Sequence, residues 1–230
     1  MSDVTIRPAT DADMPAVARS WREGGPTAIR RRGGSRPPIR TRGRRGMRTQ
    51  QQPIVVRRWP TLAGLGFAAL VAFDLMSGVD LAPVLAASAA VYLGAAALQR
   101  PAAAWPLFFA TGAVITVARL LDDRFDPTWA ILAGSAALLV YGLLRGATRP
   151  GYGLPLQTVG LAGFGTAAAA ALLVTPDLGA ALVAAGLLGH AAWDIYHHRT
   201  NRVVVRSLAE FCLVLDTALA VAIVIVTVLQ

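Results

Sequence analysis

The chain contains no lysine and only one cysteine, and both scarcities limit what it can be. All 22 basic residues are arginine, which together with the abundance of alanine, glycine and valine indicates a GC-rich bacterial genome. Cys212 has no second cysteine to pair with, which excludes an internal disulfide, and its apolar neighbours predict a buried thiol. Acidic residues are also scarce, at 13, so the chain carries a formal net charge of +9.

The positive charge is confined to the N-terminal quarter. Residues 1–58 contain 14 arginines and 4 acidic residues, whereas residues 59–230 contain 8 arginines and 9 acidic residues. The excess of arginine therefore does not mark a basic domain, and no nucleic-acid partner is predicted. Residues 24–58 are rich in Gly, Pro, Ser and Arg and cannot bury enough apolar surface to fold. Residues 1–58 are accordingly predicted to form a disordered basic tail.

The start of this tail has two further features. It lacks the short apolar core of a cleavable signal peptide. The motif Ile-Arg-Pro-Ala-Thr-x-x-Asp at residues 6–13 makes residues 1–25 resemble the opening strand and first helix of GNAT-type N-acetyltransferases. The acetyl-CoA-binding loop of that family has no counterpart here, so the resemblance implies no acetyltransferase activity. Met47 stands shortly before the first apolar run, which predicts a native start there, with residues 1–46 as an extension.

Long apolar runs dominate the chain from Trp59 onward. Hydrophobic residues make up 55% of the sequence, and the runs approach the roughly 20 residues that a helix needs to cross a bilayer. Segments with proline, glycine or charge separate the runs. The predicted spans are 59–77, 80–98, 103–121, 127–144, 155–174, 177–197 and 204–229. Residues 59–230 are therefore predicted to form an all-α integral membrane bundle of about seven transmembrane helices in the lipid bilayer.

The loop arginines predict the orientation of this bundle. With the N-terminus in the cytoplasm and seven crossings, most of them fall in inner loops: Arg100, Arg145, Arg149, Arg199, Arg202 and Arg206. The outer loops carry only Arg119 and Arg124. This asymmetry follows the positive-inside rule. It predicts a protein of the bacterial cytoplasmic membrane, with its N-terminus inside and its C-terminus outside.

All three histidines lie in one stretch at the end of the sixth span, His-Ala-Ala-Trp-Asp-Ile-Tyr-His-His at residues 190–198. A helix turns about 100° per residue, so the three histidines and the aspartate share one stripe. Imidazole and carboxylate together suit Zn²⁺ or Fe²⁺. The sequence predicts a metal or proton site, and the candidate ligands are His190, Asp194, His197 and His198.

The seventh span returns from the same side and offers partners for this stripe. By helical rise, Glu210 or Cys212 is expected at the depth of His190 and Asp194, with Asp216 deeper. Cys212 and Asp216 share a face that Glu210 does not. Glu210 is the candidate general acid or base.

An interfacial belt is the alternative explanation of the stripe. Aromatic, histidine and arginine side chains are expected where a helix leaves the bilayer, which accounts for His197 and His198. It does not account for His190 and Asp194, because ionisable groups deeper in a span need partners.

Two further patterns carry candidate residues. The His-x-x-Trp-Asp-x-x-His-His box, with Ser-Leu-Ala-Glu-Phe-Cys-x-x-x-Asp at 207–216, resembles a family of small multi-pass membrane proteins of high-GC bacteria for which no activity is established. Asp-Asp-Arg-Phe-Asp at 122–126 is similar to the diphosphate-binding motif of prenyl-transferring enzymes, but no second acidic motif accompanies it, and a solvated loop is expected. Asp74, in the first span, is predicted to bind a proton or cation or to support packing.

Two functions remain open from the sequence. The first is a membrane-embedded enzyme that uses a divalent metal to modify a lipid or isoprenoid, with the histidine stripe as ligands and Glu210 as the general acid or base. The second is a non-enzymatic small transporter, proton or ion relay, or membrane scaffold that uses the polar groups of the last two spans and Asp74.

Overall fold

The structure, a computed structural model, describes residues 58–73, 78–121 and 125–229. This part of the chain contains helices and no strands, which confirms the all-α prediction for these residues. The predicted disordered tail, the acetyltransferase-like start and the Met47 start lie outside the described residues, as do Asp74, Arg124 and the first two aspartates of the acidic loop motif.

Seven α-helices follow one another in the described ranges, and each falls on one of the predicted apolar segments. They are α3 (Trp59–Phe73), α4 (Ala82–Ala97), α5 (Ala104–Leu121), α6 (Pro127–Leu144), α7 (Leu154–Ala171), α8 (Pro176–Thr200) and α9 (Arg206–Leu229). Two short 3-10 helices, η2 (Gly78–Leu81) and η3 (Pro101–Ala103), precede α4 and α5. Proline in the first turn begins several of them, because its missing N–H would have no helical partner there.

Four helices in the described part of the chain are long and apolar enough to cross a membrane. They cover Pro101–Leu121, Pro127–Leu144, Pro176–Thr200 and Arg206–Leu229. Two further apolar helices, α3 and α4, are shorter, at 15 and 16 residues. The apolar helices indicate that the protein is a membrane protein.

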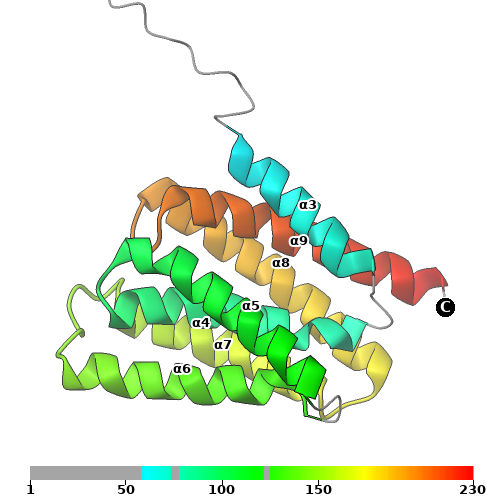
Figure 1. Cartoon of the computed structure of the whole chain (residues 1–230), viewed down its shortest axis with the longest axis horizontal. Coiled ribbons are helices and arrows are strands. Elements are labelled where there is room, and N and C mark those ends of the chain that lie inside the picture. Colours follow the sequence, from blue (N-terminus) through cyan, green and yellow to red (C-terminus); the bar gives the residue numbers. More distant parts are fainter. Residues whose placement is uncertain (1–57, 74–77, 122–124, 230) are drawn as a thin grey trace, which may run out of the picture. The chain divides into compact units, whose positions relative to one another are not determined.

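The central helix is α4, in which every residue except Val84 is buried. It contacts α5, α6, α7 and α8, and Figure 1 shows it lying among its neighbours. Half of its residues are alanine, and such small side chains allow helices in a membrane to approach closely. A polar side chain on α4 is therefore enclosed by other helices on all sides.

The last two helices form an antiparallel hairpin that is closed by residues 201–205, and α3 packs against the outer side of α9 (Figure 1). α8 is capped by Asn201, which has left-handed backbone angles (φ 51°, ψ 48°) and donates its N–H to the carbonyl of His197 at 2.8 Å. Asparagine tolerates this conformation better than most residues. The hairpin places the inner faces of α8 and α9 against each other, next to α4.

Contact between α3 and α9 depends on Gly64. A methyl group at this position would lie 2.7 Å from the carbonyl oxygen of Phe211, whereas one at Gly66 would meet nothing within 4 Å. We expect Gly64→Ala to lower the free energy of unfolding by about 1–3 kcal/mol, because the backbone of α9 must shift. Gly66→Ala is the matched control and should keep or raise stability, since alanine favours a helix by up to about 1 kcal/mol. Unfolding of both variants in detergent checks this, and equal stability of the two would contradict it.

Candidate metal site

Three ionisable side chains meet at the centre of the described bundle. His190 and Asp194 lie one turn apart on α8, and Asp216 faces them from α9. All three have an exposed fraction of 0%. One potential ligand atom from each lies within 4.8 Å of the others. We call these three residues the His/Asp cluster.

The two carboxylates of the cluster are held in the same way. Oδ2 of each faces Nδ1 of His190, at 2.8 Å for Asp216 and 3.5 Å for Asp194. Oδ1 of each accepts a hydrogen bond from a hydroxyl group on α4: Tyr92 donates to Asp194 at 2.5 Å, and Ser88 donates to Asp216 at 3.5 Å. Ser88 and Tyr92 are four residues apart, so both hydroxyls lie on one face of α4. Second-shell hydrogen bonds of this kind orient ligands in metal sites.

Two buried atoms of the cluster have no hydrogen-bond partner among the described residues. They are Nε2 of His190 and Oδ2 of Asp194. The His190 ring makes T-shaped contacts with Phe164 and Tyr92, with ring centroids 5.0 and 5.2 Å away. An unpartnered buried polar atom costs about 1–3 kcal/mol, and it calls for an explanation in a native structure. A cation held between Nδ1 of His190 and the two carboxylates would give Oδ2 of Asp194 a partner, although it would leave Nε2 of His190 without one.

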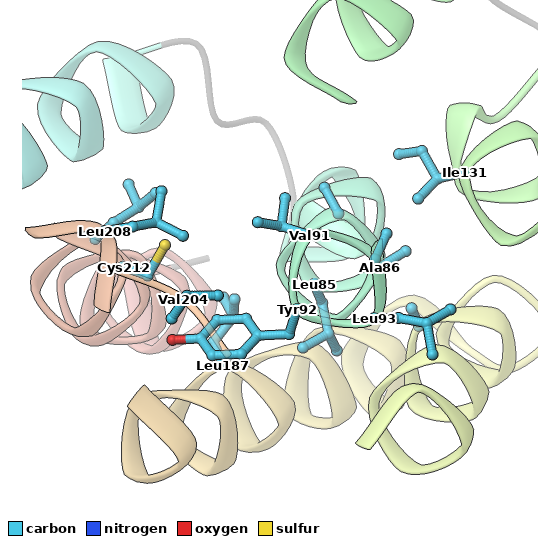
Figure 2. Close-up of a cluster of buried hydrophobic side chains, with 14 of the residues drawn as sticks. Leu85, Ala86, Val91, Tyr92, Leu93, Ile131, Leu187, Val204, Leu208 and Cys212 are labelled. Carbon is cyan, nitrogen blue, oxygen red and sulfur yellow. The ribbon is translucent and has the colours of Figure 1, made fainter. Parts of the chain in front are cut away.

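Tyr92 connects the cluster to the apolar core. Figure 2 shows its ring extending from α4 toward α8 and α9, among Leu187, Val204 and Cys212. Cys212 is buried, as predicted, and Figure 2 places its side chain beside Leu208 in the core. Apolar groups around the cluster exclude water, which strengthens the electrostatic interactions within it.

His197 belongs to a separate hydrogen-bonded group. Its Nδ1 donates to the carbonyl of Trp193 at 2.9 Å, because a carbonyl can only accept. The indole N–H of Trp193 donates to Oε1 of Gln157 at 3.1 Å, which turns the Gln157 amide nitrogen toward Nε2 of His197 at 3.0 Å. Nε2 therefore accepts, and His197 is neutral in this arrangement. Both of its nitrogen atoms are occupied, so the structure does not bring His197 to the cluster as a ligand.

The remaining candidates also lie apart from the cluster. His198 is partly exposed on the last turn of α8. Glu210 faces α3, where its Oε1 accepts a hydrogen bond from Thr61 at 2.5 Å and pairs with Arg58 at 3.3 Å. The expectation that Glu210 meets the histidine stripe therefore does not match its position, because Glu210 lies on a different face of α9 from Asp216. The spacing of Glu210 and Asp216 in the sequence predicts these two different faces.

Three polar residues around these groups could not be chosen from the sequence. Ser88 and Tyr92 stand among apolar residues in α4, and Gln157 precedes Thr158 near the start of α7. The available signal is a polar side chain within a mostly apolar helix, which in a membrane protein requires a partner. Comparisons of the chain with protein-family models, with curated proteins and with solved structures found no match, so the residues of the cluster alone indicate its chemistry.

Proposed function

We propose that the protein is an integral membrane protein that binds a divalent metal ion at the His/Asp cluster. The observation that carries the proposal is the convergence of three fully buried ligating groups, whose ligand atoms lie within 4.8 Å of one another. One imidazole and two carboxylates form a mixed nitrogen and oxygen ligand set that suits zinc or iron. The calcium and magnesium sites of proteins use oxygen ligands instead.

The distances between the ligand atoms of the cluster fit a zinc ion. Zinc binds nitrogen and oxygen ligands at about 2.0–2.2 Å, so two neighbouring ligands of one ion lie roughly 3–3.5 Å apart. Nδ1 of His190 lies 2.8 and 3.5 Å from the two carboxylate oxygens. A metal bound here would replace the proton that His190 donates to Asp216, with little movement of the side chains.

The negative charge of the His/Asp cluster also supports a bound cation. Two carboxylates and one imidazole carry at least one unit of negative charge when both carboxylates are ionised, even if the histidine is protonated. Uncompensated charge is costly in an apolar interior and in a bilayer. A divalent cation neutralises the cluster without protonating either carboxylate.

Three protein ligands leave a tetrahedral ion one open position, which is the arrangement of catalytic zinc sites. The proposal therefore extends to a metal-dependent enzyme that modifies a lipid or an isoprenoid, with the bilayer as the source of substrate. Glu210 has no part in this version of the proposal, since its carboxylate contacts α3.

The metal content of the purified full chain tests the proposal. We expect about one divalent ion per chain after chelator-free extraction, and loss of that ion in Asp194→Asn and Asp216→Asn, which keep side-chain volume. His198→Ala and Asp177→Asn are the matched controls on the same helix and should keep it. Tyr92→Phe should weaken metal affinity by about tenfold or more, because it removes the hydroxyl that holds Asp194. Metal that is absent, or that persists unchanged in both aspartate variants, would contradict the proposal.

A proton or ion relay is the second candidate, and a specific set of contacts favours it. Hydrogen bonds connect Ser88 through Asp216 to His190, and the ion-pair contact of 3.5 Å between His190 and Asp194 joins them to the hydrogen bond between Asp194 and Tyr92. Such chains occur in membrane proteins that move protons. Proton flux into liposomes that contain the protein should then fall in Asp194→Asn and persist in Asp177→Asn. Equal flux in both variants would exclude the relay.

We also propose that all seven helices cross the membrane, with the N-terminus in the cytoplasm. η2 and α4 together cover residues 78–97, which is close to the length required. Loops on the proposed cytoplasmic side hold Arg100, Arg145, Arg149 and Arg202, in agreement with the positive-inside rule. A C-terminal alkaline phosphatase fusion should be active and a C-terminal green fluorescent protein fusion dark. The reverse result would overturn this orientation.

A further inference from the structure

A cavity of about 270 Å³ lies at the end of the bundle where α4 and α8 end and α7 begins. It is lined by the segments that follow α4, α6 and α8, which are distant in sequence. Its polar lining residues include Arg100, Arg149, Tyr152, Asn201 and Arg202. We call it the arginine pocket. It is separate from the His/Asp cluster and shares no residue with it.

The charge of the arginine pocket has one sign. Three arginines line it, and none of its lining residues is acidic. The guanidinium group of Arg202 stacks over the Tyr152 ring, 4.4 Å from the ring centroid, which restricts its orientation. Guanidinium groups bind phosphate oxygens through paired hydrogen bonds. Three arginines that line one cavity therefore make it suited to an anion such as phosphate.

The backbone of the pocket is also unusual. The non-glycine residues with positive φ in the described part of the chain are Gln99 (53°), Asn201 (51°) and Val203 (69°). All three line the arginine pocket. The left-handed conformation costs an ordinary residue about 1–2 kcal/mol, and it is least expected for a β-branched valine. Strain of this kind is concentrated at ligand sites, where the surrounding structure holds it in place.

The position of the pocket shows which phosphate groups can reach it. It lies one helical turn beyond the Tyr92 and His197 layer, since Ala96 and Asn201 line it from the same helices. In the proposed orientation this end of the bundle meets the cytoplasmic headgroups. We propose that the arginine pocket binds the phosphate of a lipid headgroup or a free phosphate anion.

General attraction between a basic surface and anionic lipid is the simpler alternative, and the chain supplies controls for it. Arg145 and Arg199 lie at the same end of the bundle and carry the same charge, but neither lines the pocket. A general surface attraction would make all five arginines nearly equivalent, with a contribution of about 1 kcal/mol each. A specific pocket makes three of them much more important than the other two.

The test titrates phosphatidylglycerol, and separately inorganic phosphate, into the full chain in detergent and follows binding by native mass spectrometry and thermal unfolding. The variant with Arg100→Gln, Arg149→Gln and Arg202→Gln should raise the Kd by about tenfold or more, the loss expected when charge-assisted hydrogen bonds to phosphate are removed. The single variants should each show part of this loss, which keeps the test valid if the triple variant does not fold. Arg145→Gln and Arg199→Gln should change the Kd less than about twofold.

The two probes separate the sources. Pocket-dependent binding of phosphatidylglycerol alone assigns a lipid headgroup, and pocket-dependent binding of inorganic phosphate assigns a free anion as sufficient. Equal losses in pocket and control variants, or no loss in either, would overturn the proposal. Metal content is not involved, so a failure here is distinguishable from a failure of the metal site.

Discussion

His190→Ala is expected to lower the free energy of unfolding by about 3–5 kcal/mol, which is the effect of breaking a buried ion pair by removal of one partner. The variant leaves the carboxylates of Asp194 and Asp216 buried and facing each other, with no positive group or donor between them. It also leaves a cavity between Phe164 and Tyr92. Denaturant titration in detergent, with helicity as the signal, measures the loss.

The matched control is His198→Ala, eight residues farther along the same helix. His198 is partly exposed, so its loss should change the free energy of unfolding by less than about 0.5 kcal/mol. Similar effects of the two substitutions would mean that the cluster does not hold α8 and α9 together.

Addition of the bound metal is expected to stabilise the protein by about 2.7 kcal/mol when the free ion is at 100 times its Kd, because only the folded chain offers the complete ligand set. Zinc and iron would be tested separately against magnesium, which prefers oxygen ligands and should have little effect. A chelator should reverse the stabilisation.

The stabilisation by metal is expected to require the carboxylates of the His/Asp cluster. Asp216→Asn removes one carboxylate and should abolish the stabilisation, whereas the exposed Asp177→Asn should retain it. An equal response of both variants to the metal would point to binding at the surface, and would contradict the assignment to the cluster.

The helices could be predicted from the sequence because their boundaries are set by local chemistry. Pro127 begins a helix at the predicted residue, Pro176 begins one a residue before the predicted start, and the apolar runs between the breaks form α3 to α9. What the sequence left open is how these helices pack, since the small residues that cover α4 on every side do not mark one face.

The partner of His190 shows where prediction from the sequence ended. The predicted spans stop at 197 and restart at 204, which placed Glu210 or Cys212 near the depth of His190. α8 continues to Thr200 and α9 begins at Arg206. His190 and Asp216 therefore each lie about 15 Å along their helix from the turn at residues 201–205. The helix ends differ from the predicted ones by only a few residues, but this difference brings Asp216, and not Glu210, to the depth of His190.

The orientation of α8 relative to its neighbours determines which residues of the histidine stripe join the cluster. Four residues on one stripe predicted a common site, but the stripe of α8 meets two different surroundings along its length. His190 and Asp194 face Asp216, whereas His197 faces Gln157 of α7. Neither Gln157 nor the hydroxyl groups of α4 could be paired with the stripe from the sequence, because these contacts depend on tertiary packing between helices far apart in the chain.

Anomalous diffraction from metal-loaded crystals, measured on both sides of the metal absorption edge, tests the metal site most directly. We predict one strong anomalous peak among His190, Asp194 and Asp216, at about 2.0–2.2 Å from a ligand atom of each. No peak at this position in crystals that contain the metal, with His190 still donating directly to Asp216, would contradict the account.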